Sequence, residues 1–249
     1  MTIFIAIYIT LLGLTLGSFF NVVGLRVPAG ESLLHPPSQC PKCGARLKTL
    51  DLIPVVSYLL SRGKCRHCGT RVPLLYPLGE AATGLLFLVM YLKFGITLEG
   101  LTGALLASLS VIITVSDLRY MLIPDKVLLF FVPVFLVLVP FMTEHPLGYH
   151  VLGALSGGGV LLLLALFGGM GMGDVKLFAL LGWIIGWPGV ILAFFIACAF
   201  GAGVGGVLRL LGLIGRKQPV PFGPYLAFGA LISFLFGPEI IGAYLSFIG

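Results

Sequence analysis

Long apolar segments separated by short polar or Pro/Gly-rich breaks make up most of this sequence. An α-helix needs about 20 mostly apolar residues to cross a bilayer, and only helices or closed barrels satisfy the backbone there. Division at the breaks predicts eight helices, at residues 2–24, 77–93, 99–116, 126–142, 150–167, 175–187, 189–208 and 222–247. The sixth segment is the shortest. The pattern therefore predicts an all-α polytopic membrane protein of about eight transmembrane helices.

Composition agrees with this prediction. Hydrophobic residues make up 59% of the chain, charged residues only 10%, and the mean hydropathy is +1.13. These values are far from those of soluble domains. The first apolar segment lacks a basic n-region and a small-residue cleavage site, so we expect a retained helix and not a removable signal peptide.

The basic residues predict the orientation of the helices. With eight spans, every Lys and Arg except Lys93 falls on one side of the membrane, among them Arg216 and Lys217. By the positive-inside rule that side is cytoplasmic, and both termini lie outside. The formal net charge of +6 is then mainly a topology signal, with attraction to anionic lipid as a secondary interpretation. It requires no nucleic acid partner.

The loop at residues 26–76, between the first helix (1–25) and the remaining helical core (77–249), contains "CPKCG" at 40–44 and "CRHCG" at 65–69. Paired C-x-x-C-Gly turns are typical of a four-thiolate zinc site, because each turn directs two sulfurs the same way. The predicted ligands are Cys40, Cys43, Cys65 and Cys68. Two disulfides are the alternative, which a reducing cytoplasm disfavours. A closed four-thiolate site indicates a structural metal.

Two further side chains of ligand type have simpler interpretations. His67 lies inside the second cysteine turn and could replace a cysteine, although a solvated side chain is the commoner case. Cys198 stands alone in an apolar segment, where a cysteine usually behaves as a small buried hydrophobe.

Three aspartates stand at the predicted ends of helices. Asp125 and Asp174 each begin a helix, where a carboxylate can serve as a cap. Glu80 also begins a helix, where it complements the helix dipole. Asp117 has no such explanation, because it ends a helix at the edge of the hydrocarbon, where both the dipole and the low polarity disfavour an anion.

Topology supplies a partner for Asp117. The third helix ends and the sixth begins on the same side, so Asp117 and Asp174 can face each other. Two close carboxylates share a proton, so one can activate water while the other donates to a peptide carbonyl, as in aspartyl proteases. The glycines of "GGMGMGD" leave room for a substrate strand. The spacing of the residues alone does not decide between two interpretations. The acids could form this dyad, or they could cap helices and form ion pairs with Arg119 and Lys176.

Several motifs occur together and in order between about residues 17 and 180: "GSFFNVVGLRVP", the two cysteine pairs, "LLYPLGEAATG", D-x-R-x-x-x-I-P-D at 117–125 and "GMGDVK". In these motifs the sequence resembles the bacterial prepilin peptidases, bifunctional enzymes that mature type IV pilins and type II secretion pseudopilins. It is also similar in motif to the broader G-x-G-D intramembrane aspartyl proteases.

The resemblance implies that Asp117 and Asp174 are the catalytic pair and that Asp125 belongs to the motif but not to the dyad. It implies a multi-pass protein of the bacterial inner membrane that cleaves prepilins and pseudopilins on the cytoplasmic side, after the glycine that ends a short basic leader. It also implies N-methylation of the new terminus from S-adenosylmethionine, with 26–76 as the methyltransferase-associated loop and 77–249 as the peptidase core.

The sequence offers no independent site for the methyl donor. "GAGVGG" at 201–206 satisfies G-x-G-x-x-G but lies inside an apolar helix, and its Gly201 and Gly205 have the spacing of small-residue helix packing. Two other classes remain as alternatives: a transporter or channel with cation-binding carboxylates and a regulatory zinc loop, and a membrane scaffold whose zinc module binds a partner. Serine and metalloprotease motifs are not found.

Overall fold

The computed structural model describes residues 2–143, 145–213, 215 and 220–248. Arg216 and Lys217, which entered the predicted charge distribution, lie outside these residues. The chain divides into two compact units, residues 1–115 and 116–249, and the division falls within helix α4 (Leu98–Tyr120). The described residues form helices, with two isolated β-bridges but no strands. The predicted all-α class is confirmed, and seven of the helices are long and apolar enough to cross a membrane.

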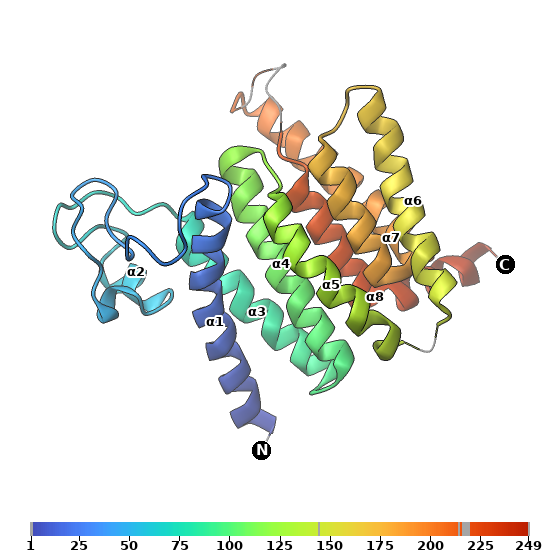
Figure 1. Ribbon diagram of the computed structural model, residues 1–249, viewed down its shortest axis with the longest axis horizontal. Coiled ribbons are helices and arrows are strands. Elements are labelled where there is room, and N and C mark those ends of the chain that lie inside the picture. Colours follow the sequence, from blue (N-terminus) through green and yellow to red (C-terminus); the bar gives the residue numbers. More distant parts are fainter. Residues whose placement is uncertain (1, 144, 214, 216–219, 249) are drawn as a thin grey trace. The chain divides into compact units, whose positions relative to one another are not determined.

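The first unit contains α1 (Thr2–Arg26), α3 (Leu75–Phe94) and the first part of α4. Helix α1 packs along α3, as Figure 1 shows. The two backbones approach closely at Gly17, where an added Cβ would lie 2.8 Å from both the Glu80 Cα and the Thr83 Oγ1. The loop from α1 to α3 carries one turn of 3-10 helix, η1 (Thr49–Asp51), and the short helix α2 (Val56–Leu60).

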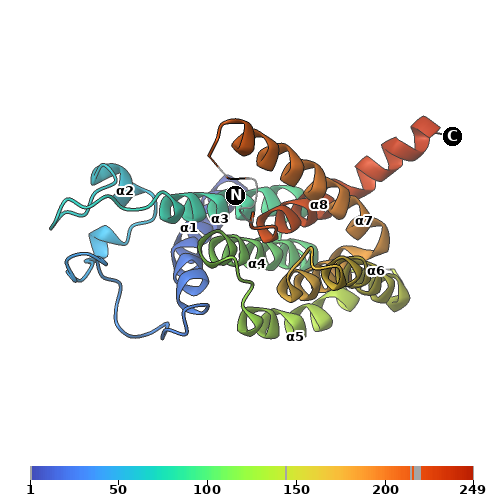
Figure 2. The same cartoon turned by 90° about the horizontal axis from the view of Figure 1, so that it is seen from above.

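The second unit contains the end of α4 and helices α5 (Asp125–Met142), α6 (Leu147–Leu166), α7 (Met172–Leu210) and α8 (Gly223–Ile248). Helix α7 is its centre, because α5, α6 and α8 all pack against it, as Figure 2 shows from above. Glycines permit the closest of these contacts. Gly153 of α6 and Gly182 of α7 face each other so closely that a Cβ on either would meet the other's carbonyl oxygen.

Helix α7 corresponds to two of the eight predicted segments. Its 39 residues would extend about 58 Å if straight. Instead, Gly186 has φ 76° and ψ 172°, and Pro188 follows, so the helix breaks there. Phe178 and Phe194 would be about 24 Å apart along a straight helix, yet their ring centroids lie 6.1 Å apart. The two halves therefore run back along each other, and the predicted break between 187 and 189 is confirmed to within a few residues.

The other predicted boundaries also hold to within a few residues, with one difference that matters for the site. The third helix was expected to end at residue 116 but continues to Tyr120. Asp117 therefore lies within the last turn of α4 and not beyond it. The apolar segment ends before the helix does. The helix continues through Ser116, Asp117 and Arg119 because its backbone hydrogen bonds form within the helix, whether or not its side chains are apolar.

Candidate active site and candidate metal centre

Asp117 is held at the meeting point of two helices. It lies in the last turn of α4 and is 5% exposed. Its Oδ2 accepts a hydrogen bond of 2.8 Å from the backbone N–H of Gly223, the first residue of α8. The first N–H groups of a helix have no partner within that helix and attract anions. The N-terminus of α8 therefore compensates a carboxylate that its own helix disfavours.

Sequence reasoning missed Gly223. A signal was present, because the dipeptide Gly223–Pro224 precedes an apolar segment, and proline in the first turn is typical of a helix start. The predicted topology also placed this start on the same side of the membrane as Asp117. What the sequence could not indicate was which of the helix starts on that side would receive the carboxylate.

Asp174 is the third residue of α7 and is half-buried. Its Oδ2 accepts a hydrogen bond of 3.3 Å from the N–H of Gly171, the residue before the helix. A carboxylate at this position that reaches back to the N-cap backbone is a known capping arrangement. The capping interpretation of Asp174 is therefore correct. It does not exclude chemistry, because the capping hydrogen bond uses only one of the two carboxylate oxygens.

The segment between α4 and α5 brings these two acids into one neighbourhood. The Ser116 hydroxyl donates to the Leu122 carbonyl at 2.6 Å, which folds the chain back after α4. The next residue, Ile123, contacts the start of α7, where a Cβ on Gly173 would lie 2.9 Å from the Ile123 Cβ. Asp117 precedes this segment in α4, and Asp174 directly follows Gly173 at the start of α7. Both carboxylates belong to the second unit.

Asp125 was expected to cap its helix or to serve the motif, and the capping prediction is wrong. Pro124 occupies the N-cap position of α5, and Asp125 follows as the first helical residue without a capping hydrogen bond. Its two carboxylate oxygens instead accept from the Lys176 Nζ at 2.8 and 2.9 Å. Lys176, offered as a partner of the dyad, is thus paired with Asp125. The two side chains are 50% and 70% exposed, which makes this a solvated ion pair of small energetic value.

The geometry of the acids suits shared-proton chemistry. Each carboxylate has one oxygen fixed by a backbone N–H, so each is oriented without being neutralised by a cation. Where two carboxyl groups share a site, they do not both ionise readily, and one then retains a proton. Such a pair can deprotonate a water molecule and donate a proton to a peptide oxygen.

The four predicted cysteine ligands lie together in the first unit. The Sγ atoms of Cys40, Cys43, Cys65 and Cys68 are all within 4.8 Å of one another, and all four thiols are free. Two turns of the same form build this cluster. In each turn the first cysteine's N–H donates to a carbonyl five residues later, Ala45 or Thr70, at 3.0 and 2.8 Å. Gly44 and Gly69 take positive φ angles of 68° and 70°, which explains the glycine after each cysteine pair.

The cluster has the dimensions of a tetrahedral zinc site. A zinc–sulfur bond of about 2.3 Å separates the sulfurs of a tetrahedron by roughly 3.8 Å, and the Cys40 and Cys68 Sγ atoms are 3.8 Å apart. Hydrogen bonds from the side chain and backbone of Thr70 lower the pKa of the Cys68 thiol to about 6, whereas burial and the neighbouring thiols raise the pKa of Cys43 to about 11. A low pKa favours the thiolate that zinc requires. The cluster could therefore hold zinc, and four sulfurs would leave no position for water.

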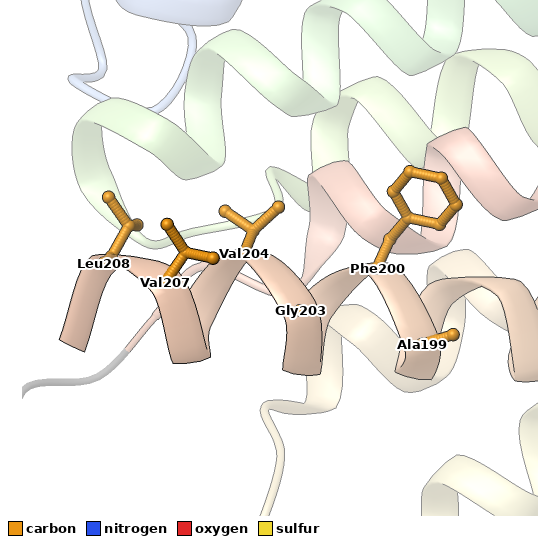
Figure 3. A pocket seen from close by; sticks show the side chains of 6 residues that line it. All are labelled: Ala199, Phe200, Gly203, Val204, Val207 and Leu208. Atoms are coloured by element: carbon orange, nitrogen blue, oxygen red, sulfur yellow. The ribbon is translucent and has the colours of Figure 1, made fainter. Parts of the chain in front are cut away.

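An apolar hollow of about 450 Å³ lies on the second half of α7, far along the helix from Asp174 in sequence. Figure 3 shows its lining: Ala199, Phe200, Gly203, Val204, Val207 and Leu208. It overlaps the "GAGVGG" segment, and no polar side chain lines it. The expected small-residue packing is half correct, because a Cβ on Gly201 would contact Tyr225 at 3.4 Å, whereas Gly205 faces open space.

Comparison with known proteins identifies the family. Residues 11–94 match the family described as Bacterial Peptidase A24 N-terminal domain, and residues 104–206 match the Type IV leader peptidase family. A protein of Bacillus subtilis (strain 168) named Prepilin leader peptidase/N-methyltransferase is 39% identical, covering 94% of this chain and 95% of the relative. A protein of the same name from Pseudomonas putida is 34% identical, covering 96% and 93%.

The chain belongs to the type IV leader peptidase family. The resemblance first seen in the motifs is thus confirmed. The chain is a multi-pass membrane protein of a peptidase family. The first family match contains all four clustered cysteines, and the second contains Asp117 and Asp174. No solved structure matches the chain.

Proposed function

We propose that this chain is a bifunctional prepilin peptidase. It cleaves the basic leader of type IV prepilins and pseudopilins after glycine and then methylates the new N-terminus from S-adenosylmethionine. The names of the relatives support both activities. The observation that carries the proteolytic half is the placement of Asp117 and Asp174 at the ends of separate helices of the second unit, each with one carboxylate oxygen held by a backbone N–H.

In the proposed hydrolysis, one carboxylate takes a proton from a water molecule as the water oxygen bonds to the scissile carbonyl carbon. The other carboxyl group donates its proton to the carbonyl oxygen. The tetrahedral intermediate then collapses, the C–N bond breaks, and the leaving amine takes up a proton. The backbone N–H of Gly223 holds the Asp117 oxygen during these transfers, so that little reorganisation is needed.

The glycines before Asp174 give the substrate access to the dyad. Gly169 and Gly171 have only one atom each within 4 Å of an added Cβ, and Gly168 has none. This stretch is non-helical and ends at the start of α7. An extended peptide can approach Asp174 from this side, because these three glycines place no side chain there.

In the methylation step, the amine nitrogen exposed by cleavage attacks the methyl carbon of S-adenosylmethionine, the carbon–sulfur bond breaks, and the amine loses a proton. We infer that residues 26–76 belong to this activity and that residues 77–249 form the peptidase core. The four cysteines would hold zinc as a structural metal that fixes the fold of the loop.

We infer that the loop, Asp117 and Asp174 face the cytoplasm. The distribution of Lys and Arg supports this orientation, because nearly all of them fall on the side of the loop in an eight-span topology. In bacteria this places the protein in the inner membrane, with substrates that present their basic leaders to the cytoplasm.

The test is incubation of the purified full-length protein with a prepilin, with and without S-adenosylmethionine, followed by mass measurement of the products. Without the methyl donor we expect a peptide shortened by its leader. With the donor we expect the same peptide heavier by one methyl group. An unchanged prepilin in both reactions, from a protein that is folded, would refute the proposal.

A further inference from the structure

The loop between α1 and α3 exposes an apolar segment at residues 50–60. Six of its side chains are at least 40% exposed: Leu50, Leu52, Ile53, Val56, Leu59 and Leu60. Large apolar surfaces in a polar loop mark a binding face for a lipid or a protein. These side chains belong neither to the cysteine cluster nor to the pair of acids, so the proposed chemistry does not explain their exposure.

Two polar contacts fix the position of the apolar segment within the first unit. On one side, the Val55 N–H donates to the Glu80 Oε2 at 2.7 Å. Glu80 is 9% exposed and lies in the second turn of α3, a membrane-spanning helix. On the other side, Asp51 pairs with Arg66, which lies between two of the clustered cysteines, at 3.3 Å.

The hydrogen bond to Glu80 stabilises a strained backbone conformation at Val55. Val55 has φ 59° and ψ −48°, and the Val56 N–H donates to the Pro54 carbonyl, which makes a strained γ-turn that is costly for a β-branched residue. The buried Glu80 carboxylate stabilises this turn by accepting the Val55 N–H. The turn places the apolar segment beside the first turns of α3, a helix long and apolar enough to span the membrane.

Charge gathers on the same loop. Residues 26–76 contain eight Lys or Arg and only two acidic residues, so the loop carries a formal charge of +6, equal to that of the whole chain. Seven of the basic residues are exposed: Lys42, Arg46, Lys48, Arg62, Lys64, Arg66 and Arg71. Figures 1 and 2 agree that the loop extends sideways from the ends of α1 and α3 and does not stack above them.

We propose that residues 50–60 lie in the membrane interface and that the surrounding basic residues bind anionic phospholipid headgroups. Exposed leucines beside Lys and Arg are the composition of segments that lie on anionic bilayers. Spanning helices tether the loop at both ends, so lipid is always within reach, whereas a protein partner would have to be encountered. The surface thereby anchors the cysteine loop against the bilayer.

The test uses bromine-labelled lipid acyl chains, which quench tryptophan fluorescence on contact. The full-length Leu59→Trp variant is reconstituted into vesicles of brominated phosphatidylglycerol and compared with the parent protein, which contains Trp183 and Trp187. We expect the added tryptophan to be quenched at least about twofold more than an added tryptophan in a His67→Trp variant, because His67 is exposed within the second cysteine turn.

Two comparisons separate the parts of the proposal. The quenching at position 59 should fall by about half in brominated phosphatidylcholine or at high salt, because screening weakens headgroup binding. Equal quenching in both lipids would overturn the anionic specificity. Quenching no greater than that of His67→Trp would overturn the docking itself and favour a protein partner.

The hydrogen bond between the Val55 N–H and Glu80 allows a second, independent test. In the Leu59→Trp protein, Glu80→Leu removes the acceptor for the Val55 N–H, whereas Glu80→Gln keeps a carbonyl oxygen there. We expect quenching to decrease in the Leu variant and to persist in the Gln variant. Equal quenching in the two folded variants would contradict the claim that Glu80 fixes the position of the apolar segment. Both results are independent of prepilin cleavage, so they leave the proposed activity to its own test.

Discussion

Asp117 shows how a single carboxylate can be disfavoured by one helix and held by another. It lies at the C-terminal end of α4, yet its Oδ2 accepts the N–H that α8 leaves unpaired at Gly223. The sequence indicated the unfavourable half of this arrangement, because the helix end and the acid are both visible in it. The compensating half depends on which helix start packs there, and no local pattern carries that information.

A Gly223→Pro substitution tests this contact because it deletes the N–H and fixes φ near its helical value. Proline is tolerated at the first position of a helix, so α8 should form. A hydrogen bond to a charged group contributes about 1.5–3 kcal/mol, and we expect prepilin cleavage to slow by roughly 10- to 100-fold. Cleavage rates under single-turnover conditions provide the measurement. Gly223→Ala, which keeps the N–H, is the control, and equal rates in both variants would exclude a role for this donor.

At the scale of elements, glycine decides how closely the helices of the second unit approach. The apolar pattern predicted where helices begin and end, and the break at Gly186 was visible in the adjacent Gly–Trp–Pro sequence. The pattern could not show that the broken helix doubles back or which glycines lie in contacts. Gly153 and Gly159 stand on the same helix, and only the first faces another backbone.

The pair Gly153→Ala and Gly159→Ala tests this packing. An added methyl at Gly153 would meet backbone atoms of Gly182 and Gly186, whereas one at Gly159 meets nothing within 4 Å. Forced separation of packed elements costs about 1–3 kcal/mol, so we expect a lower unfolding temperature for Gly153→Ala only. Thermal unfolding in detergent monitors both variants. A decrease of equal size in both would contradict the contact, because the gain in helix propensity from Gly→Ala is stabilising and common to both positions.

At the scale of the whole molecule, the cysteine cluster and the acidic pair belong to separate compact units. The sequence predicted both groups of residues, because C-x-x-C-Gly turns are local and the acids stand at recognisable helix ends. It did not predict that Glu80 positions the apolar segment, because a short helix and a strained Val55 produce no periodic pattern of apolar residues in the sequence. The separation suggests that the two proposed activities can be lost independently.

Cys40→Ser and Cys65→Ser should release the metal and impair methylation more than cleavage. Loss of one ligand opens a closed zinc site and loosens the loop. We expect methylation to fall about tenfold or more, with cleavage changed by no more than about threefold. Metal content by mass spectrometry and product masses report the two effects. Cys198→Ser, a free cysteine of α7 outside the cluster, is the matched control; parallel loss of both activities would argue against separate functional regions.

The measurement that tests the central claim most directly is the rate of prepilin cleavage by Asp117→Asn, Asp174→Asn and Asp125→Asn proteins purified side by side. Asparagine keeps the shape of the side chain but cannot exchange the proton, and general acid–base groups contribute at least about 100-fold to a rate. We expect such losses for Asp117→Asn and Asp174→Asn. Asp125→Asn should lose little, because it removes only an exposed ion pair. Full cleavage by either of the first two variants would contradict the account.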